Sequence, residues 1–182
     1  MISKEELNSL LEDLQANNHD VFDTFYDKTK NVIYYTIYSI LKDKSLAEDV
    51  MQDTYLKILK NINSYQPNTN GLAWMIMIAK NLSINVYNKR KREVLVDNYF
   101  DKDETELVNE EKEETPLIDL MHEVLKPKER ELIVMHVINQ LTHKEIAEIL
   151  NRPLGTVLWQ YNQAIKKLRK KVGEKNGKKT SR

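Results

Sequence analysis

Amide and basic side chains share one face of a predicted helix in the middle of the chain. The spacings of four, three and four residues put the members of this stripe on one side of an α-helix. Amides can hydrogen-bond to base edges and cations can contact phosphates, so the stripe suits nucleic acid, although a solvated helix end would look similar. The stripe consists of Asn81, Asn85, Asn88 and Arg92, with Lys80, Lys89 and Arg90 beside it.

The segment before this helix carries the strongest turn signal of the chain. Residues 64–71 combine Pro67 and Gly71 with several polar side chains, and Tyr65, Asn68 and Asn70 could border a pocket for an unstacked base. An aromatic ring would stack on the base, and donors and acceptors would bind its edge. The alternative is that Tyr65 is a residue at the edge of the core.

A helix-turn-helix is predicted over residues 142–171. Thr142 and Glu145 form a capping box that opens the first helix, and Pro153 suits the start of the second. Ala147 and Val157 provide the small residue and the β-branched plug of such a motif, and Asn151 tolerates the left-handed turn between the helices. The motif would insert its second helix into a major groove. An ordinary helical hairpin is the alternative.

Composition excludes several classes of protein. The 182 residues contain no cysteine, which excludes disulfides and thiolate chemistry, and only four glycines and four prolines, which favours helices. The four histidines show no metal-ligand spacing, and the chain lacks a glycine-rich phosphate loop or a nucleophile motif. We therefore expect no enzymatic activity, no metal and no cofactor. The start of the chain lacks a secretory signal and no run is apolar enough to cross a membrane, so a cytoplasmic protein without membrane insertion is expected.

The net charge of zero is a sum of opposed blocks. Residues 80–92 carry five basic and no acidic side chains, residues 93–116 carry two and ten, and residues 165–182 carry nine and one. Two basic blocks, each ending a helical segment, favour a polyanionic partner over merely solvated faces. Helical periodicity fades in the acidic block, which is interpreted as a flexible linker.

These patterns predict an all-α fold of two small helical domains joined by an acidic linker. The first domain spans 1–92, with helices expected near 4–14, 21–41, 45–62 and 72–92. The linker spans 93–116, and the second domain spans 117–182, with a helix starting near Pro116 and a break at Lys126 and Pro127. The helix near 45–62 is expected to open with a capping box of Ser45 and Glu48. One face of that helix is too polar to be buried in the core. It carries Asp49, Gln52, Asp53 and Leu56.

Taken together, these segments resemble the sigma-70 family of bacterial RNA polymerase sigma factors, in its small extracytoplasmic-function group. The resemblance covers about residues 20–92 and 117–172. It is carried by residues 46–56 (LAEDVMQDTYL), the Ala73-Trp74-Met75 to Asn81 segment, and residues 125–130 with 145–150 and 155–157.

The resemblance implies a division of roles. The face of Asp49, Gln52, Asp53 and Leu56 would dock on the clamp helices of the largest polymerase subunit. Loop 64–71 and the helix after it would melt and hold the −10 element, while the helix-turn-helix would read the −35 element. The acidic linker would thread near the active-centre cleft. The family commonly adds an anti-sigma factor, a partner that this sequence alone neither names nor requires.

The second helix of the motif departs from the family pattern. Leu158, Trp159 and Gln160 follow Gly-Thr-Val where the family commonly has a basic residue, Ser and Arg, and Gln163-Ala164-Ile165 replaces a common Arg-Ala-Arg. Glutamine and asparagine fit adenine, so an A/T-leaning −35 element is expected, unless Leu158 and Trp159 pack within the protein or against a regulator. The expected −35 contacts are His143, Lys144, Thr156, Trp159, Gln160, Asn162, Gln163, Lys166 and Lys167.

Two other classes of function remain open from sequence. A helix-turn-helix regulator would bind duplex DNA without becoming a polymerase subunit, and it would need neither the Asp49 face nor the strand-holding loop. A protein-only interaction module would use the helices as docking surfaces and leave the basic tail solvated.

Overall fold

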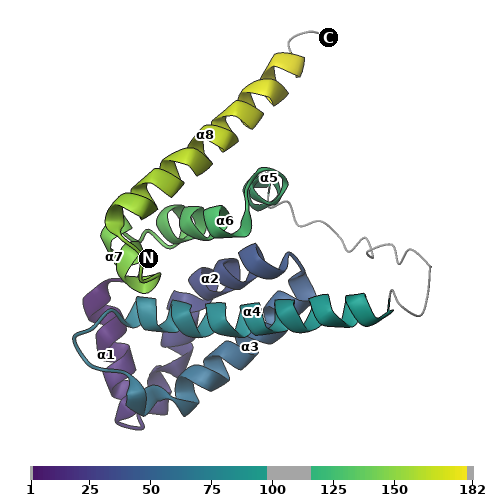
Figure 1. Ribbon diagram of the computed structural model, residues 1–182. Coiled ribbons are helices and arrows are strands. Elements are labelled where there is room, and N and C mark those ends of the chain that lie inside the picture. Colours follow the sequence, from purple (N-terminus) through teal and green to yellow (C-terminus); the bar gives the residue numbers. More distant parts are fainter. Residues whose placement is uncertain (1, 98–115, 180–182) are drawn as a thin grey trace.

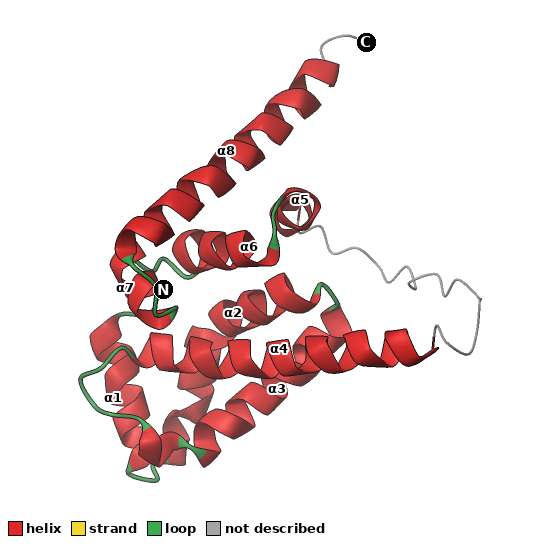
Figure 2. Ribbon diagram, viewed as in Figure 1, coloured by secondary structure: helices red, strands yellow, loops and turns green. Residues whose placement is uncertain are grey.

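The computed structural model describes residues 2–97 and 116–179, and all regular structure in those ranges is helical (Figure 2). The predicted all-α class is therefore confirmed. The α-helices are α1 (Lys4–Gln15), α2 (Phe22–Leu41), α3 (Lys44–Lys60), α4 (Gly71–Asp97), α5 (Pro116–Val124), α6 (Pro127–Ile133), α7 (His143–Ile149) and α8 (Leu154–Lys179). Short 3-10 turns lie at η1 (His19–Val21) and η2 (Ile62–Ser64), and η3 (Val134–Ile138) is π-helical.

Helices α1 to α4 form the first helical unit, the lower bundle in Figure 1. Its core joins inward-facing residues of all four helices, including Leu11 of α1, Ile33 of α2, Ile58 of α3 and Met75 of α4. The ring of Phe25 meets Tyr55 edge-on at 5.8 Å between centroids. Burial of such side chains contributes about 1.5–3 kcal/mol each, which makes this core the main source of stability for the unit.

Polar groups inside this core are paired. The Tyr55 hydroxyl donates to Thr29 Oγ1 at 2.8 Å, and the Thr29 hydroxyl in turn donates to the Phe25 carbonyl oxygen. Burial raises the pKa of Tyr55, so its phenol stays neutral at physiological pH. The chain of hydrogen bonds removes the cost of burying two hydroxyls between α2 and α3.

The start of α7 agrees with its predicted cap, and the start of α3 differs from its prediction. Ser3 caps α1 by accepting a hydrogen bond from Glu6 N, and Thr142 and Glu145 form the expected capping box of α7. The predicted box of Ser45 and Glu48 is wrong, because Asp43 is the N-cap of α3 and accepts from Leu46 N. Lys42, at φ 54°, ends α2 in the left-handed region, which leaves Asp43 extended and ready to cap.

Helix α4 is longer than expected. It continues to Asp97, whereas the sequence patterns predict an end near Arg92 and a linker from Glu93. Residues 93–97 contain no proline or glycine, so nothing local stops the helix where the acidity begins. The rest of the predicted linker, 98–115, lies outside the described residues.

Helices α5 to α8 form the second helical unit. Met121, Leu125, Ile133 and Val134 pack against Ala164 and Leu168 of α8. The predicted helix start at Pro116 and the break before Pro127 are confirmed, and Pro127 occupies the first turn of α6, where its missing N–H costs nothing.

The two units share a second apolar cluster. Val32 of α2 and Ile76 of α4 pack with residues from the second unit, and Figure 1 shows α6 and α7 lying over α2 and α4. Both side chains are buried, Ile76 completely. The sequence patterns predict two separate cores, but these residues join them. The second-unit members are Leu132, Met135, Leu141, Ile146, Ala147 and Val157.

His122 of α5 gives the protein a predictable response to acid. Burial, Arg130 and Lys42 lower the pKa of its imidazole from 6.5 to about 4, and a backbone hydrogen bond at Tyr38 and the charge of Asp119 offset only part of this shift. Between pH 6.5 and pH 4, His122 is therefore protonated in the unfolded chain but not in the folded chain. The free energy of unfolding falls as the pH drops through this range. We expect His122 to lower the free energy of unfolding by about 1 kcal/mol between pH 7 and pH 4.5. This figure is smaller than the full pKa shift implies, because the imidazole is partly exposed to solvent.

Denaturant unfolding of wild type and a His122→Gln variant at both pH values measures this effect. The variant should lose less stability than wild type over the same interval. His19→Gln, at an exposed position before α2, is the matched control and should behave as wild type. Equal pH dependence in wild type and His122→Gln would refute the assignment to His122.

No helix in the described ranges combines the length and apolar character that crossing a membrane requires.

Candidate polymerase and nucleic-acid interface

The polar face of α3 points away from the bundle. Ala47, Val50, Thr54, Tyr55 and Ile58 are buried on the inner side of the helix, so the opposite side faces solvent. All four predicted docking residues are exposed, and Leu56 has 66% of its surface accessible although it is apolar. An exposed leucine flanked by acids and an amide is typical of a protein contact. The four residues are Asp49, Gln52, Asp53 and Leu56.

The amide stripe of α4 is exposed as predicted. Ala79 and Ser83 bury the opposite side of the helix, and the Ser83 hydroxyl donates to the Ala79 carbonyl oxygen. The structure adds apolar side chains that sequence reasoning missed, since Ile84 is 36% and Tyr87 is 48% exposed. Tyr87 follows Lys80 by seven residues and precedes Lys91 by four, which places the three on one face of a helix. This spacing in the sequence could have indicated the exposed apolar side chains. The exposed amides are Asn81, Asn85 and Asn88.

Several cations of α4 already have partners. Lys80 Nζ lies 2.6 Å from Glu131 Oε1 of α6, and Arg90 Nη1 lies 2.7 Å from Asp43 Oδ2. Arg92 Nε donates to the Asn88 carbonyl oxygen one turn back. Lys89 is exposed. A phosphate would therefore have to replace a carboxylate at Lys80 and at Arg90.

Tyr65 does not line an open pocket. Its ring is 3% exposed and packs on Trp74 at 5.4 Å, and its hydroxyl donates to Asn8 Oδ1 at 2.7 Å. Burial raises the pKa of this phenol. The core-edge alternative describes Tyr65 in this structure, and a base cannot stack on its covered ring. Helix α1 also holds the loop through Gln15, which donates to the Tyr65 carbonyl oxygen.

Of the other residues predicted to act in loop 64–71, Asn68 is exposed and Asn70 makes hydrogen bonds. Asn68 is exposed at φ 63°, a backbone conformation that asparagine tolerates. Asn70 caps α4 by accepting from Ala73 N, and its amide donates to Glu145 Oε1 of α7 at 3.3 Å. Gly71 is closely packed, because a Cβ there would lie 2.5 Å from Leu11 Cδ1 and would force that side chain to move.

The helix-turn-helix has the predicted internal geometry. Val157 is fully buried, Ala147 is 7% exposed where α7 meets α8, and Asn151 adopts φ 49° at the turn. Arg152 N donates to the Ala147 carbonyl oxygen at 2.9 Å, which closes the end of α7. The motif therefore fixes the angle at which α8 leaves the turn.

The outer face of α8 is accessible along its first turns. Trp159 is 63% and Leu158 is 39% exposed, so neither side chain packs inside the chain. Gln163 is half-buried, and Gln160 accepts a hydrogen bond from Arg152 Nη1 at 3.3 Å. The remaining predicted contacts on this face are exposed at Thr156, Asn162 and Lys166.

Two predicted −35 residues are engaged elsewhere. His143 lies in an aromatic cluster, 4.1 Å from His136 and 4.7 Å from Tyr161 between ring centroids, and burial followed by the charge of His136 lowers its pKa. Its neighbour Lys144 is exposed. Lys167 Nζ lies 2.6 Å from Glu129 Oε1. His143 thus acts as a packing residue here, because its ring closes the base of α8.

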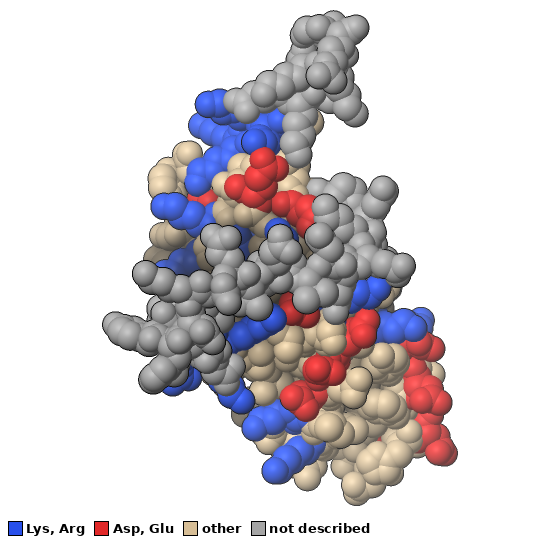
Figure 3. Space-filling model, turned by 90° about the vertical axis from the view of Figure 1, so that its right-hand side faces the viewer, with Lys and Arg blue, Asp and Glu red and all other residues tan. Residues whose placement is uncertain are grey.

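Basic side chains gather on the second unit. Figure 3 shows Lys and Arg gathered over the upper part of the molecule, beside a smaller group of acidic side chains, and Asp and Glu along one edge of the lower part. Such a basic surface attracts polyanions with strong salt dependence and little sequence preference. The exposed amides and Trp159 on the same helix provide groups that can read bases.

Comparison with known proteins decides the family. Residues 25–93 match the model of sigma-70 region 2, and residues 116–168 match the model of sigma-70 region 4. The chain belongs to the sigma-70 family, in its extracytoplasmic-function (ECF) group. It is 28% identical to the ECF RNA polymerase sigma factor SigW of Bacillus subtilis, over 89% of this chain and 94% of that protein. It is 26% identical to the ECF sigma factor SigK of Mycolicibacterium vanbaalenii, over 92% and 90%.

Solved structures share the fold. CnrH, in complex with the cytosolic domain of CnrY, matches with a TM-score of 0.70 at 18% identity, over 92% of this chain and 97% of that one. The sigma factor RpoE of Bartonella quintana, in complex with the anti-sigma factor NepR, matches with a TM-score of 0.65 at 20% identity, over 81% and 95%. The residues that match region 2 span most of α2, α3 and α4, and those that match region 4 span α5 to α7 and much of α8.

Proposed function

We infer that this sigma factor binds RNA polymerase core and directs promoter-specific initiation. The observation that carries the proposal is the presence in one chain of an exposed acidic docking face on α3 and an exposed reading helix, α8. A helix-turn-helix regulator would need only the second of these. Sigma factors are not enzymes, and we propose that this chain likewise contributes binding and positioning rather than catalysis, in the cytoplasm where polymerase works.

We propose that α3 docks on the clamp helices of the largest polymerase subunit. Asp49 and Asp53 would meet basic residues of the partner, and Gln52 and the exposed Leu56 would fill the contact between them. Charged residues around an apolar centre steer association and fix its register.

We propose that loop 64–71 and α4 hold the displaced strand of the −10 element. The exposed amides Asn68, Asn81 and Asn85 would hydrogen-bond to bases, and Lys80, Lys89 and Arg92 would follow the phosphates. Tyr65 would support this surface from beneath rather than touch a base, because its ring is covered.

We propose that α8 reads the −35 element in the major groove. Gln163 and Asn162 offer both a donor and an acceptor, which fits adenine, and Trp159 can meet a thymine methyl group. Lys144, Thr156 and Lys166 would contact phosphates on either side. The carbonyl oxygen of the Gln160 side chain accepts from Arg152, which fixes how that amide is presented.

The proposed function is tested by mixing the full chain with sigma-free polymerase core on linear promoter templates. Promoter-dependent transcripts should appear only when both proteins are present. Duplex binding by the chain without any core-dependent transcript would instead support the regulator alternative, and neither activity would leave a protein-only interaction module.

Replacing Gln163 with Ala should relax the preference at one −35 position. Each good bidentate contact discriminates by about 1–3 kcal/mol, so affinity for the preferred sequence should fall about tenfold or more while other sequences change little. Binding to a set of duplexes with single-base changes measures this. Lys166→Ala is the contrasting variant and should lower the affinity for all of these duplexes by the same factor. A uniform loss of affinity for Gln163→Ala would exclude a base contact.

A further inference from the structure

Helix α1 packs along loop 64–71, although it lies before residues 25–93, which match region 2. Figure 1 shows α1 beside the loop that leads into α4. Two polar side chains of this helix, Asn8 and Gln15, reach the loop and bind it. Four buried leucines anchor the helix in the core of the first unit: Leu7, Leu10, Leu11 and Leu14.

Gln15 fixes the start of the loop. Its side-chain amide donates to the carbonyl oxygens of Ile62 and Tyr65, each at 2.8 Å. The NH₂ group of a glutamine has two hydrogens to donate, so both are used here. The backbone that enters the loop is therefore held to α1 at two points.

Asn8 joins the two ends of the loop. Its Oδ1 accepts from the Tyr65 hydroxyl at 2.7 Å, and its Nδ2 donates to the Thr69 carbonyl oxygen at 3.4 Å. Thr69 N in turn donates to the Gln66 carbonyl oxygen at 3.3 Å, which closes a turn that contains Asn68 at φ 63°. The exposed Asn68 is thus fixed by contacts on both sides of it.

Leu11 brings α1 against the last residue of the loop. A Cβ on Gly71 would lie 2.5 Å from Leu11 Cδ1 and 3.2 Å from Asn8 Oδ1, so helix and loop backbone are in close contact where α4 begins. The loop is therefore held by α1 at its start, across its middle and at its end. A loop held in this way does not have to be ordered by the strand that binds it.

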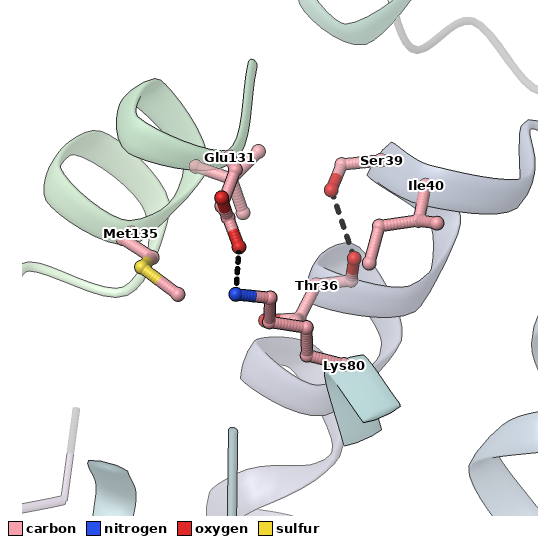
Figure 4. Close-up of a pocket in the computed structure, with 7 residues that line it drawn as sticks. Thr36, Ser39, Ile40, Lys80, Glu131 and Met135 are labelled. Carbon is pink, nitrogen blue, oxygen red and sulfur yellow. Dashed lines mark hydrogen bonds and ion pairs between the residues drawn. The ribbon is translucent and has the colours of Figure 1, made fainter. Parts of the chain in front are cut away.

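These contacts are separate from the ion pair that joins α4 to the second unit. Figure 4 shows Lys80 reaching from α4 to Glu131 of α6, beside Thr36 and Ser39 of α2, and Lys80 Nζ lies 2.6 Å from Glu131 Oε1. Neither of the two polar side chains of α1 takes part in this ion pair. Changes at those positions therefore act on the loop and leave the ion pair in place.

We propose that α1 is a positioning element for strand capture, in which Asn8 and Gln15 hold loop 64–71 in the shape that presents Asn68 to the displaced strand of the −10 element. Neither Asn8 nor Gln15 touches the strand. A loop that is already ordered loses less conformational entropy on binding, and a fixed amide at Asn68 selects the base that matches its donor and acceptor. This proposal rests on the proposed function of loop 64–71.

The test compares Asn8→Ala/Gln15→Ala with wild type, each bound to core polymerase, on single-stranded −10 oligonucleotides that differ at single bases. Affinity for the preferred oligonucleotide should fall about fivefold, because the variant must order its loop on binding. Affinity for the other oligonucleotides should fall less, since they gain little from a fixed Asn68, so the preference should weaken. Affinity for a −35 duplex should stay as in wild type. A variant that is only less stable would instead bind every oligonucleotide more weakly by one common factor.

Ser3→Ala is the matched control. The Ser3 hydroxyl accepts from Glu6 N and caps α1 at the end away from Gln15, so its loss weakens the same helix. The control should keep the wild-type preference among the oligonucleotides. Asn8→Ala and Gln15→Ala as single variants should each show part of the change, which keeps the test decisive if the double variant folds poorly.

Hydrogen exchange in the free full-length chain follows the loop itself. Amides within residues 62–71 should exchange faster in Asn8→Ala/Gln15→Ala than in wild type, because the contacts that restrain the loop are gone. Amides of α8 should exchange at the wild-type rate. The loop of Ser3→Ala should also exchange as in wild type.

Three outcomes overturn the positioning role of α1. An unchanged preference in Asn8→Ala/Gln15→Ala does so, as does an equal loss of affinity for every oligonucleotide, which would assign the effect to stability. Unchanged exchange in the loop would show that α1 does not order it. A wild-type holoenzyme that does not discriminate among −10 strands would instead overturn the proposed role of the loop, so the two failures are distinguishable.

Discussion

Replacing Asp49 and Asp53 with lysine is expected to weaken binding of this sigma factor to polymerase core by at least about tenfold, or roughly 1.4 kcal/mol. Both side chains are exposed on α3, and reversal turns two attractions with a basic partner into two repulsions. The fold should not change, because surface substitutions of this kind alter the free energy of unfolding by about 0.5 kcal/mol or less. Core affinity measured by fluorescence anisotropy, with thermal unfolding in parallel, separates the two effects.

A charge-matched variant provides the control. Glu12→Lys/Asp23→Lys changes the net charge equally at exposed positions on α1 and α2. It should retain core affinity close to wild type at moderate salt. If both variants lose affinity equally, the loss reflects overall charge, and the docking face has been placed on the wrong helix.

Replacing Tyr65 with Ala is expected to lower the free energy of unfolding by about 3–5 kcal/mol, the cost of removing a large buried side chain. The ring packs on Trp74, and its hydroxyl reaches Asn8 of α1, so the variant would open a cavity where α1 meets loop 64–71. That is a large part of the stability of a small unit. Denaturant unfolding followed by tryptophan fluorescence measures it.

Tyr65→Phe separates packing from hydrogen bonding. It keeps the ring and removes only the bond to Asn8, which should cost about 1 kcal/mol. A Tyr65→Ala variant that is as stable as wild type but slow to open promoters would restore the base-pocket interpretation and contradict the burial seen here.

Local sequence signals predicted the elements well because each depends on a few neighbouring residues. The Thr142 capping box, the left-handed Asn151 and the buried Val157 all follow from short-range rules. The N-cap of α3 was misplaced because Asp43 and Ser45 are equally able to cap, and only the left-handed Lys42 selects between them. The predicted end of α4 is wrong because it rests on the onset of acidic residues, which do not by themselves stop a helix.

The partners of site residues could not be predicted from local patterns. Lys80 and Glu131 are distant in sequence and meet only when the two units close, and the same is true of Asn70 and Glu145. His143 appears in sequence as an exposed residue at a helix start, but His136 and Tyr161 enclose it. Helical periodicity gives the face on which a residue lies, not what covers that face.

The most direct test of the division of roles is site-specific crosslinking in an open promoter complex with core polymerase. Single cysteines introduced as Asn85→Cys on α4 and Asn162→Cys on α8 would carry a short photo-crosslinker, since no native cysteine competes. The account predicts that the α4 probe labels the non-template strand of the −10 element and the α8 probe labels the −35 duplex. Both probes labelling the same element, or the α4 probe labelling no DNA in a complex that initiates, would contradict it.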